Sequence, residues 1–457
     1  MIDKKNIYKA YYLFLFLHLS IWTAIPYFSN INLPLDTIEA LAWGSDLKWG
    51  YSKHPPLSAF FAEIFFQIFG NQDWAFYMLS QIFVLTAFIA IFELSNSLLE
   101  NKNLALISIL LLEGIYFYNF TSPEFNVNVS QLPFWALSIL FSYRCIKLNQ
   151  TKDYIFLGIF LGLGVLSKYL FIYLASGIYL SFFYFYLNEK KDKLLNVLLS
   201  GIIFLIILMP HLFWLSQNDF STISYGFKRT GGVGDLTDHL IYPILFFLKQ
   251  LGILIPFFIM GFCLINKFNM KIDLKDKKTL FLNFTVIVPI ILMIITSMIM
   301  GAKIRTMWMT PFYLALGTLF LMLFKKQINL KKLKKFYLVF LFIFTFSPFT
   351  YLTISLLDDT KRTDYPGKEI SRLVQNKWND NFVNDIKIVI GDEWSAGNLS
   401  YHLKSRPVWV NDLKKKGLTI TDDQGVIYTG NPKILKKVCP GVFGSIKPVG
   451  YCMIGKR

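Results

Sequence analysis

Eleven long apolar segments constrain this chain more than any other feature of its sequence. A helix needs about 20 apolar residues to cross the hydrocarbon core of a bilayer. Hydrophobic residues make up 54% of the 457 residues and charged residues 16%, whereas soluble domains carry about 25% charged residues. The sequence therefore predicts a polytopic α-helical membrane protein. The predicted spans are residues 9–28, 74–98, 104–120, 131–148, 154–170, 171–187, 194–215, 239–265, 280–300, 307–324 and 336–356.

Two of these segments need a decision about their limits. The first follows a charged N-terminus and has no small-residue cleavage site, so we expect an uncleaved span and not a signal peptide. The stretch 154–187 is long enough for one long or two short spans. We predict two, broken around Ser167, Lys168 and Tyr169, because a lysine in the middle of a lipid-facing helix is costly.

Lysine-rich segments predict how the chain is oriented. They occur at residues 1–9, 188–193, 266–278 and 325–335, and the positive-inside rule places such segments in the cytoplasm. This arrangement accounts for the net charge of +17 better than nucleic-acid binding does. The remaining loops, 29–73, 121–130, 216–238 and 301–306, would be periplasmic together with the tail. We therefore expect a multi-pass protein of the bacterial inner membrane, with a cytoplasmic N-terminus and a periplasmic C-terminus.

The tail changes character after residue 356. Charge rises and the long apolar runs stop, which divides the chain into a transmembrane domain (1–356) and a small periplasmic α/β domain (357–457). Short strands are predicted in DIKIVIGDEW and GVIYTG, and a helix start in AGNLSYHL. Cys439 and Cys452 lie in this tail, where a disulfide and two separate thiols both stay open.

The first predicted periplasmic loop carries the most suggestive chemistry. Asp36 and Glu39 are three residues apart, so they share one face of a helical turn. Lys53 and His54 follow, just before a double proline that fixes the chain. A carboxylate beside a cationic pair suits removal of a proton from an acceptor, while the cations hold an anionic leaving group such as a lipid phosphate. The alternative is an ordinary solvated loop that caps helices.

A family resemblance favours the chemical interpretation. The loop reads D-x-x-E-x-L-A-W-G followed by W-G-Y-x-K-H-P-P-L, which resembles the first periplasmic loop of bacterial glycosyltransferase family 39. That family is protein-mannosyltransferase-like and belongs to the GT-C superfamily, as do lipid A aminoarabinose transferase and the rhizobial core galacturonosyl transferases. Further similar motifs are SPEFNVN (122–128), GLGVLSKY (162–169), PHLFWLSQNDF (210–220), MWMTPFY (307–313), YPGKEIS (365–371) and GDEWSAGNLSYHL (391–403).

The resemblance implies a GT-C fold and an inverting transfer of a sugar from an undecaprenyl-phosphate-linked donor to an acceptor at the periplasmic face. Lipid A or the lipopolysaccharide core is the acceptor it favours, with other envelope glycans and proteins left open. Asp36 matches the family's acidic residue, as base or acceptor-positioning group. In many relatives the two acids are adjacent. In this sequence Asp36 is followed by Thr37 and Glu39 comes later, so the role of Glu39 is less defined. Glu124 matches a second acid, with capping of a helix as its alternative.

Basic residues are the expected partners of the donor phosphate. Lys53 and His54 match the basic position before the double proline, although a packed neutral histidine is an equal alternative for His54. Lys168 lies at a periplasmic helix junction, where it would bind phosphate or extend to the membrane interface.

Two further loops hold cations on the predicted periplasmic side. Lys303 and Arg305 lie in a short loop where the positive-inside rule predicts none, and the planar fork of Arg305 suits phosphate best. The glycine-rich segment 224–235 lacks a Walker or dinucleotide motif. It would form a lid that brings Lys228 and Arg229 to the phosphate, or a plain flexible loop.

The remaining expectations concern cofactors, partners and competing functions. We expect no required cofactor, with a divalent metal held by Asp36, Glu124 and His54 left open. The expected partners are the lipid-linked donor, the envelope glycan acceptor and membrane lipids, with no nucleic acid, and the chain is expected to be a monomer. A transporter or flippase of lipid-linked sugars is disfavoured, because transporters show internal repeats and charges at the membrane midplane. A non-catalytic scaffold leaves the clustered acids and lysines unexplained.

Overall fold

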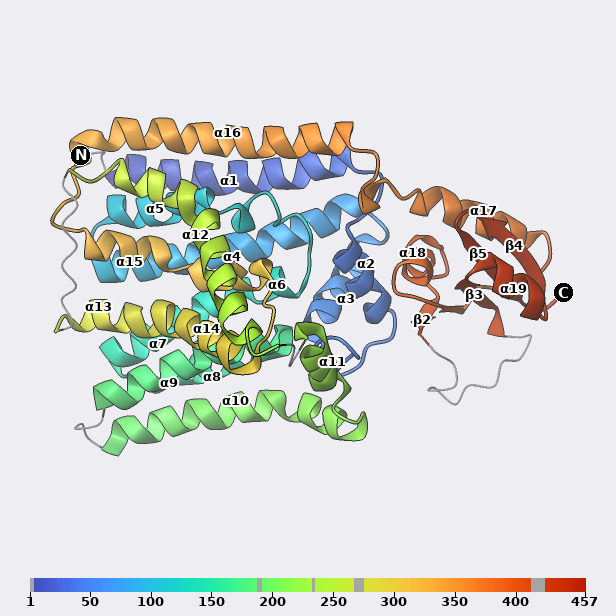
Figure 1. Ribbon diagram of the computed structural model, residues 1–457, viewed down its shortest axis with the longest axis horizontal. Coiled ribbons are helices and arrows are strands. Elements are labelled where there is room, and N and C mark those ends of the chain that lie inside the picture. The colour runs from blue at the N-terminus through green and yellow to red at the C-terminus, as the bar shows by residue number, and fades with distance from the viewer. Residues whose placement is uncertain (1–3, 187–190, 232–234, 267–274, 412–423) are drawn as a thin grey trace.

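A bundle of long helices carries a small sheet domain at one end in the computed structural model (Figure 1). The structure describes residues 4–186, 191–231, 235–266, 275–411 and 424–457. The N-terminus lies at the end of the bundle away from the sheet. The lysine-rich connection 325–335 lies at that same end, opposite the first loop, as the sequence predicts (Figure 1). Residues 188–190 and 267–274, which belong to two other lysine-rich segments, lie outside the described residues.

The helical part runs from residue 4 to residue 357. Its α-helices are α1 (Lys4–Ser29), α2 (Leu35–Gly44), α3 (Leu57–Phe69), α4 (Asp73–Leu99), α5 (Lys102–Leu110), α6 (Val127–Ser130), α7 (Leu132–Leu148), α8 (Thr151–Ser167), α9 (Ile172–Tyr186), α10 (Lys191–Gln217), α11 (Ser221–Thr230), α12 (Asp238–Phe262), α13 (Lys277–Leu282), α14 (Val288–Met300), α15 (Leu316–Leu323) and α16 (Leu333–Leu357). Short 3-10 or π turns join them at η1 (Leu111–Gly114), η2 (Tyr116–Tyr118), η3 (Tyr169–Phe171), η4 (Asn283–Ile287), η5 (Thr306–Tyr313) and η6 (Leu330–Lys332).

The prediction of a polytopic helical protein is confirmed, but the count of eleven spans is not. Within the described residues, seven helical stretches are long and apolar enough to cross a membrane, and eight if the bent pair of η5 and α15 is one span. The other predicted segments are helical but short. Helices α7 and α8 have 17 residues each, at the lower limit for crossing a bilayer, and α5 has nine.

The predicted break inside residues 154–187 is present. Helix α8 ends at Ser167, Lys168 is extended (φ −163°, ψ 136°), and η3 begins at Tyr169. A Cβ on Gly164 would lie 2.2 Å from the ring of Phe171, so the glycine lets the chain after the break fold back against α8. The break leaves Lys168 at a junction between helices and outside the spans.

The C-terminal part contains a five-stranded sheet in the order β2-β1-β3-β5-β4. Strands β1, β2 and β3 are parallel, while β5 is antiparallel to both of its neighbours, β3 and β4. The predicted strands and helix of the tail are confirmed as β1, β3 and α18. The elements are η7 (Arg362–Asp364), α17 (Gly367–Asn379), β1 (Ile388–Ile390), α18 (Ser395–His402), β2 (Val408–Val410), β3 (Val426–Gly430), α19 (Pro432–Val438), β4 (Val442–Ile446) and β5 (Val449–Ile454).

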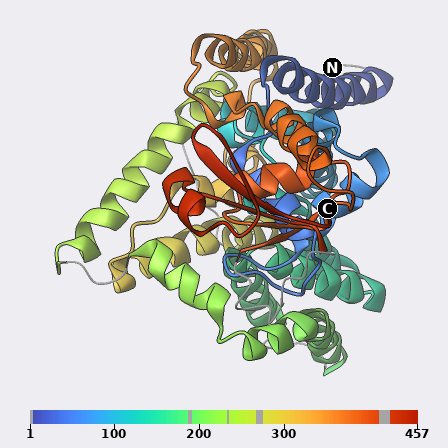
Figure 2. The same ribbon diagram turned by 90° about the vertical axis from the view of Figure 1, so that its right-hand side faces the viewer.

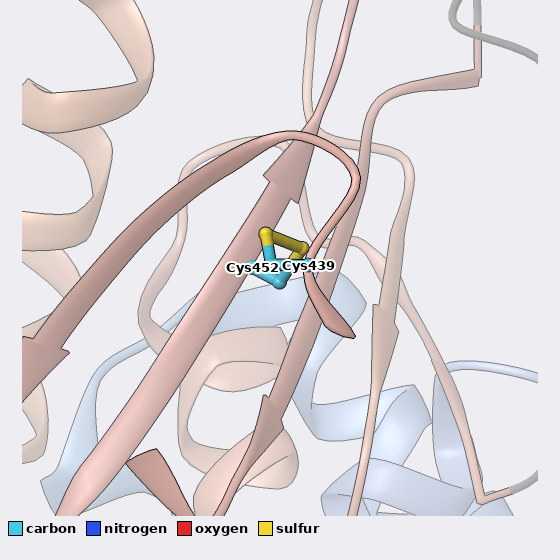
Figure 3. The surroundings of a disulfide bond; sticks show 2 residues. All are labelled: Cys439 and Cys452. Carbon is cyan, nitrogen blue, oxygen red and sulfur yellow. A yellow bond between two sulfur atoms is a disulfide. The ribbon is translucent and has the colours of Figure 1, made fainter. Parts of the chain in front are cut away.

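The sheet domain has its own core and its own covalent link. Trp378 of α17 packs among Val389, Ile427 and Met453, all of which are buried. Cys439, after α19, forms a disulfide with Cys452 of β5 (Figure 3). Of the two alternatives that the sequence leaves open, the structure has the disulfide.

Polar contacts fix the sheet domain on the first loop of the bundle. The side-chain amide of Asn32 donates to Oδ1 of Asn398 at 2.8 Å. Nη2 of Arg406 donates to the carbonyl of Leu41 and to Oε2 of Glu63, both at 2.7 Å. Figure 2, which faces the sheet end, shows the sheet domain lying over the helical bundle. Helix α2 is therefore held between the sheet domain and the spans.

Candidate active site

A cavity of about 400 Å³ opens at the end of the bundle that carries the sheet domain. Its wall is built from α2, the loop that follows α2, residues 126–128, the junction after α8, α11, and residues 300–308. Five regions that the sequence analysis singles out meet here. They are the first loop, the loop 121–130, the junction at Lys168, the loop 216–238 and the loop 301–306. The lining includes the predicted site residues Asp36, Glu39, Lys53, His54, Lys168, Arg229 and Arg305.

Helix α2 positions the two acids of the first loop. Pro34 precedes the helix in an extended conformation (φ −60°, ψ 160°) and so sets where the helix starts. Asp36 lies in the first turn, where the helix dipole favours a negative charge. Glu39 is one turn further along, and both side chains line the cavity. The predicted shared face is confirmed.

Aromatic packing orders the loop after α2. The ring of Tyr51 stacks on Trp43 at 5.2 Å, and its hydroxyl donates to the Trp43 carbonyl at 3.0 Å. Thr222 of α11 donates to the Tyr51 carbonyl at 2.6 Å. A Cβ on Gly50 would lie 2.3 Å from the ring of Trp214, so a glycine is required for this close approach. The motif at 210–220 thus holds the first loop in place.

Lys53 lies between two carboxylates. Its ammonium is 2.5 Å from Oε2 of Glu39 and 3.1 Å from Oε1 of Glu393. Burial raises the pKa of Glu39 to about 7, although Lys53 opposes the rise. Burial acts to lower the pKa of Lys53, but the two carboxylates outweigh it and raise that pKa. Lys53 is therefore a firmly protonated cation at the cavity wall.

Lys168 is a buried cation on another wall. Its side chain donates to Oδ1 of Asn128 at 2.5 Å, and its ammonium lies 4.9 Å from the centre of the Trp308 ring. Burial lowers the pKa of Lys168 to about 7; Asp36 opposes this shift and Arg305 adds to it. The Lys168 side chain lines the cavity and is buried. It therefore does not extend to the membrane interface.

Asp36 and Glu124 are two acids that lie against one another. Oε1 of Glu124 accepts a 3.0 Å hydrogen bond from the backbone N–H of Asp36. Burial, followed by the Asp36 charge, raises the pKa of Glu124 to about 8. Burial also raises the pKa of Asp36, but Lys168, Lys53 and Arg305 oppose this rise. The cations act on Asp36, so they favour the ionised form of this member of the pair.

His54 lies on the cavity wall with its ring edge-on to Tyr225, 6.1 Å between centres. Burial lowers the pKa of His54 to about 3, and the charges of Lys168, Lys53 and Arg229 add to the shift. The imidazole is therefore uncharged at neutral pH. Any contact that it makes with a phosphate is that of a neutral N–H donor.

The remaining basic residues separate into two groups. Arg305 and Arg229 have exposed side chains that line the cavity. Lys228 and Lys303 are exposed but are not part of the lining. The backbone N–H of Lys303 donates to the carbonyl of Thr230 at 3.1 Å. This bond joins the loop at 301–306 to the end of α11. Residues 232–234 of the predicted lid lie outside the described residues.

Asp36, Glu124 and His54 are the residues that the sequence leaves open as ligands of a divalent metal. Among the residues that the structure describes, no group of three or more histidine, cysteine or carboxylate side chains is arranged to hold a metal ion. Glu124 is turned toward the backbone of Asp36 and is not part of the cavity lining. The structure thus does not bring these three residues together as a ligand set.

Glu393, which contacts Lys53, was missed by the sequence analysis, as were Asn128 and Trp308 beside Lys168. Glu393 belongs to the similar motif GDEWSAGNLSYHL but was not singled out. It follows β1, and functional side chains in α/β sheets gather at the carboxyl ends of parallel strands. Reading Asp392 and Glu393 as residues at the end of a buried strand would have drawn attention to them, but not to their contact with Lys53.

The comparisons with known proteins agree with this architecture. Residues 53–214 match the family model described as dolichyl-phosphate-mannose-protein mannosyltransferase. The apo structure of ArnT from Cupriavidus metallidurans superposes with a TM-score of 0.66 at 10% identity, covering 97% of this chain and 98% of that one. The chain has the GT-C fold. The resemblance drawn from the motifs is therefore confirmed, and no curated protein sequence matches the chain.

Two other GT-C structures add detail. ArnT from Cupriavidus metallidurans bound to undecaprenyl phosphate superposes with a TM-score of 0.62 at 12% identity, covering 97% of this chain and 98% of that one. The apo oligosaccharyltransferase of Archaeoglobus fulgidus gives a TM-score of 0.51 at 10% identity, covering 94% of this chain and 70% of that one. At these identities the likeness concerns the GT-C fold.

Proposed function

We propose that this protein is a glycosyltransferase that moves a sugar from a polyprenyl-phosphate donor to an acceptor at the cavity, with inversion at the anomeric carbon. One observation carries the proposal: Asp36 lies in the same cavity as Lys53, Lys168 and Arg305, beside the membrane spans. A lipid-linked donor reaches such a cavity from the bilayer. The undecaprenyl phosphate bound to an ArnT of the same fold supports this class of donor.

In the proposed reaction, an acceptor hydroxyl attacks the anomeric carbon while the bond from that carbon to the phosphate oxygen breaks. The hydroxyl proton passes to the Asp36 carboxylate, and the polyprenyl phosphate leaves. Burial raises the pKa of Asp36, which brings a carboxylate closer to the range in which it accepts a proton well. Glu124 serves this step indirectly, since it holds the backbone of Asp36.

The cations stabilise the charge that develops on the leaving phosphate. Lys53, Lys168 and Arg305 line the cavity from different elements, so in this proposal they approach a phosphate from more than one side. Preorganised positive groups of this kind favour the transition state, because they need no rearrangement when the charge appears. Arg229 on α11 is a fourth such group at the cavity wall.

The acceptor that we propose is lipid A or the lipopolysaccharide core. This rests on the motif resemblance to lipid A aminoarabinose transferase, and the full-length superposition on ArnT supports it. With this acceptor, the reaction takes place at the periplasmic face of the bacterial inner membrane. The lysine-rich connection 325–335, at the end of the bundle opposite the cavity, supports that orientation.

The test is mass spectrometry of lipid A and core oligosaccharide from cells in which the gene is deleted and then complemented. Loss of one hexose, amino-sugar or uronate mass on deletion, restored by the wild-type gene and not by Asp36→Asn, is the expected result. Full restoration by Asp36→Asn would refute the proposed base. An unchanged glycolipid profile on deletion would refute the proposed acceptor.

A further inference from the structure

Lys53 is a candidate phosphate-binding residue whose charge already has partners. Its side chain is 27% exposed, while those of Glu39 and Glu393 are 11% and 15% exposed. Two carboxylates within 2.5 and 3.1 Å of one ammonium leave a net negative charge around it when both are ionised. An arriving phosphate therefore meets a lysine whose charge is already compensated.

Glu393 is held rigidly in this position. It lies in the turn between β1 and α18, where Oδ1 of Asp392 accepts hydrogen bonds from the backbone N–H groups of Trp394 at 2.9 Å and Ser395 at 2.8 Å. Gly391 starts the turn with φ +150°, and a Cβ there would lie 2.0 Å from Oγ1 of Thr429. The turn thus requires a glycine to pack this closely on β3.

The same domain is anchored to the helix that carries the other acid. Arg406 and Asn398 bind the carbonyl of Leu41 and the amide of Asn32 at the two ends of α2. Because α2 also carries Glu39, the two carboxylates that contact Lys53 come from separate domains locked in one register. The contact from Glu393 is therefore a built feature of the interface and not a chance surface ion pair.

We propose that Glu393 is a positioning residue that competes with the donor phosphate for Lys53, and so sets how tightly the site holds polyprenyl phosphate. This inference rests on the proposed function and deepens it. When the phosphate binds, the Lys53 ammonium exchanges its contact with Glu393 for one with a phosphate oxygen. When the sugar has been transferred, Glu393 takes the ammonium back and the lipid phosphate leaves.

The direction of the expected effect separates this role from a structural one. Removing the Glu393 charge takes away both a competitor and a source of repulsion, so the phosphate should bind more tightly. Loss of a residue needed only for folding would weaken binding and lower thermal stability together. A gain of affinity cannot arise from a damaged site.

The experiment measures the Kd of undecaprenyl phosphate for the full chain in nanodiscs. We compare wild type, Glu393→Gln, Glu393→Ala and a control, Glu369→Gln, which alters an exposed acid on α17 of the same domain. Both Glu393 variants should lower the Kd about three- to tenfold, and the control should match wild type. Undecaprenol, which has no phosphate, should bind all four proteins equally.

Each outcome decides the matter. An unchanged or higher Kd in both Glu393 variants, with wild type binding undecaprenyl phosphate, would overturn the role of Glu393 and leave the proposed function standing. An equal gain in affinity for undecaprenol would also overturn it, since the effect would then not concern the phosphate. No binding of undecaprenyl phosphate by wild type would overturn the proposed function and this inference together. Thermal unfolding of each variant identifies a protein that fails to fold, and the second variant then carries the test.

Discussion

The carboxylate of Glu124 accepts a 3.0 Å hydrogen bond from the backbone N–H of Asp36, across a sequence separation of 88 residues. Glu124, in the loop 121–130, thus holds the first turn of α2, the helix that carries Asp36. The bond gives the two acids different tasks. Glu124 faces the backbone, whereas Asp36 lines the cavity beside the cations.

This division of tasks predicts unequal effects of two isosteric substitutions. Asp36→Asn removes the proposed base and should lower kcat about 10²- to 10⁴-fold. Glu124→Gln should cost less than about tenfold, because Glu124, with a pKa of about 8, is already neutral at pH 7 and a glutamine oxygen accepts the same bond. Turnover of the purified protein with a polyprenyl-phosphate sugar measures both. Equal losses would contradict this division of tasks.

The pKa of Lys168 predicts how phosphate binding depends on pH. Burial lowers this pKa to about 7, so the lysine loses its charge as the pH rises from 7 to 9, while the phosphate stays a dianion. The Kd of undecaprenyl phosphate should therefore rise over this range, by at most about tenfold per pH unit. Lys53, whose pKa is raised, stays charged throughout.

A pair of variants assigns this pH effect. Glu39, with a pKa of about 7, gains a negative charge over the same range and acts in the same direction. Lys168→Met should bind more weakly at pH 7 and show a shallower rise in Kd, whereas Glu39→Gln should retain the lysine's part of the rise. Titration of Kd between pH 6.5 and 9 distinguishes them. A slope that survives in Lys168→Met and vanishes in Glu39→Gln would assign the effect to Glu39.

Much of this architecture could be predicted because membrane spans and strands leave local patterns. The break at Lys168 follows from the energetic cost of a lysine in lipid, and the shared face of Asp36 and Glu39 follows from helical geometry. The count of eleven spans is not confirmed, since α7 and α8 have 17 residues each, which is the lower limit for crossing a bilayer, and α5 has nine. Apolar composition records burial in protein and in lipid alike.

The site was only partly predictable for a similar reason. Motifs identified most of the residues that line the cavity, because their chemistry stands out in an apolar chain. The contact of Glu393 with Lys53 joins residues 340 positions apart in the sequence, and it depends on how two domains dock. The inward hydrogen bond of Glu124 likewise depends on tertiary structure, so no local pattern could distinguish it from a cavity acid.

The disulfide predicts the stability of the sheet domain. Cys439 and Cys452 are 13 residues apart and link the end of α19 to β5, and closing a loop of about 15 residues stabilises a fold by about 3 kcal/mol in the chain-entropy model. Cys439→Ala with Cys452→Ala should lower the free energy of unfolding of this domain by about 2–3 kcal/mol. Binding to the distant cavity should be unchanged. Reduced wild type serves as the matched control, and an unfolding midpoint that reduction leaves unaltered would contradict the prediction.

Arg406 is predicted to hold the two domains together. Its guanidinium binds the carbonyl of Leu41 and the carboxylate of Glu63, and lies 4.2 Å from the centre of the Phe66 ring. The side chains of Arg406 and Glu63 are only 13% and 9% exposed. Removing one partner of a buried ion pair leaves the other charge unpaired, which costs about 3–5 kcal/mol.

Arg406→Met should therefore destabilise the interface, whereas Arg406→Met combined with Glu63→Met should recover part of the loss, because no buried charge then remains. Limited proteolysis of the connection between α16 and the sheet domain reports separation of the domains, and thermal unfolding reports the free energy. The single variant should be cleaved there faster than the double variant. The Kd for undecaprenyl phosphate should change in the single variant as well, because α2 carries Asp36 and Glu39. Equal cleavage of both variants would show that the charge pair does not hold this interface.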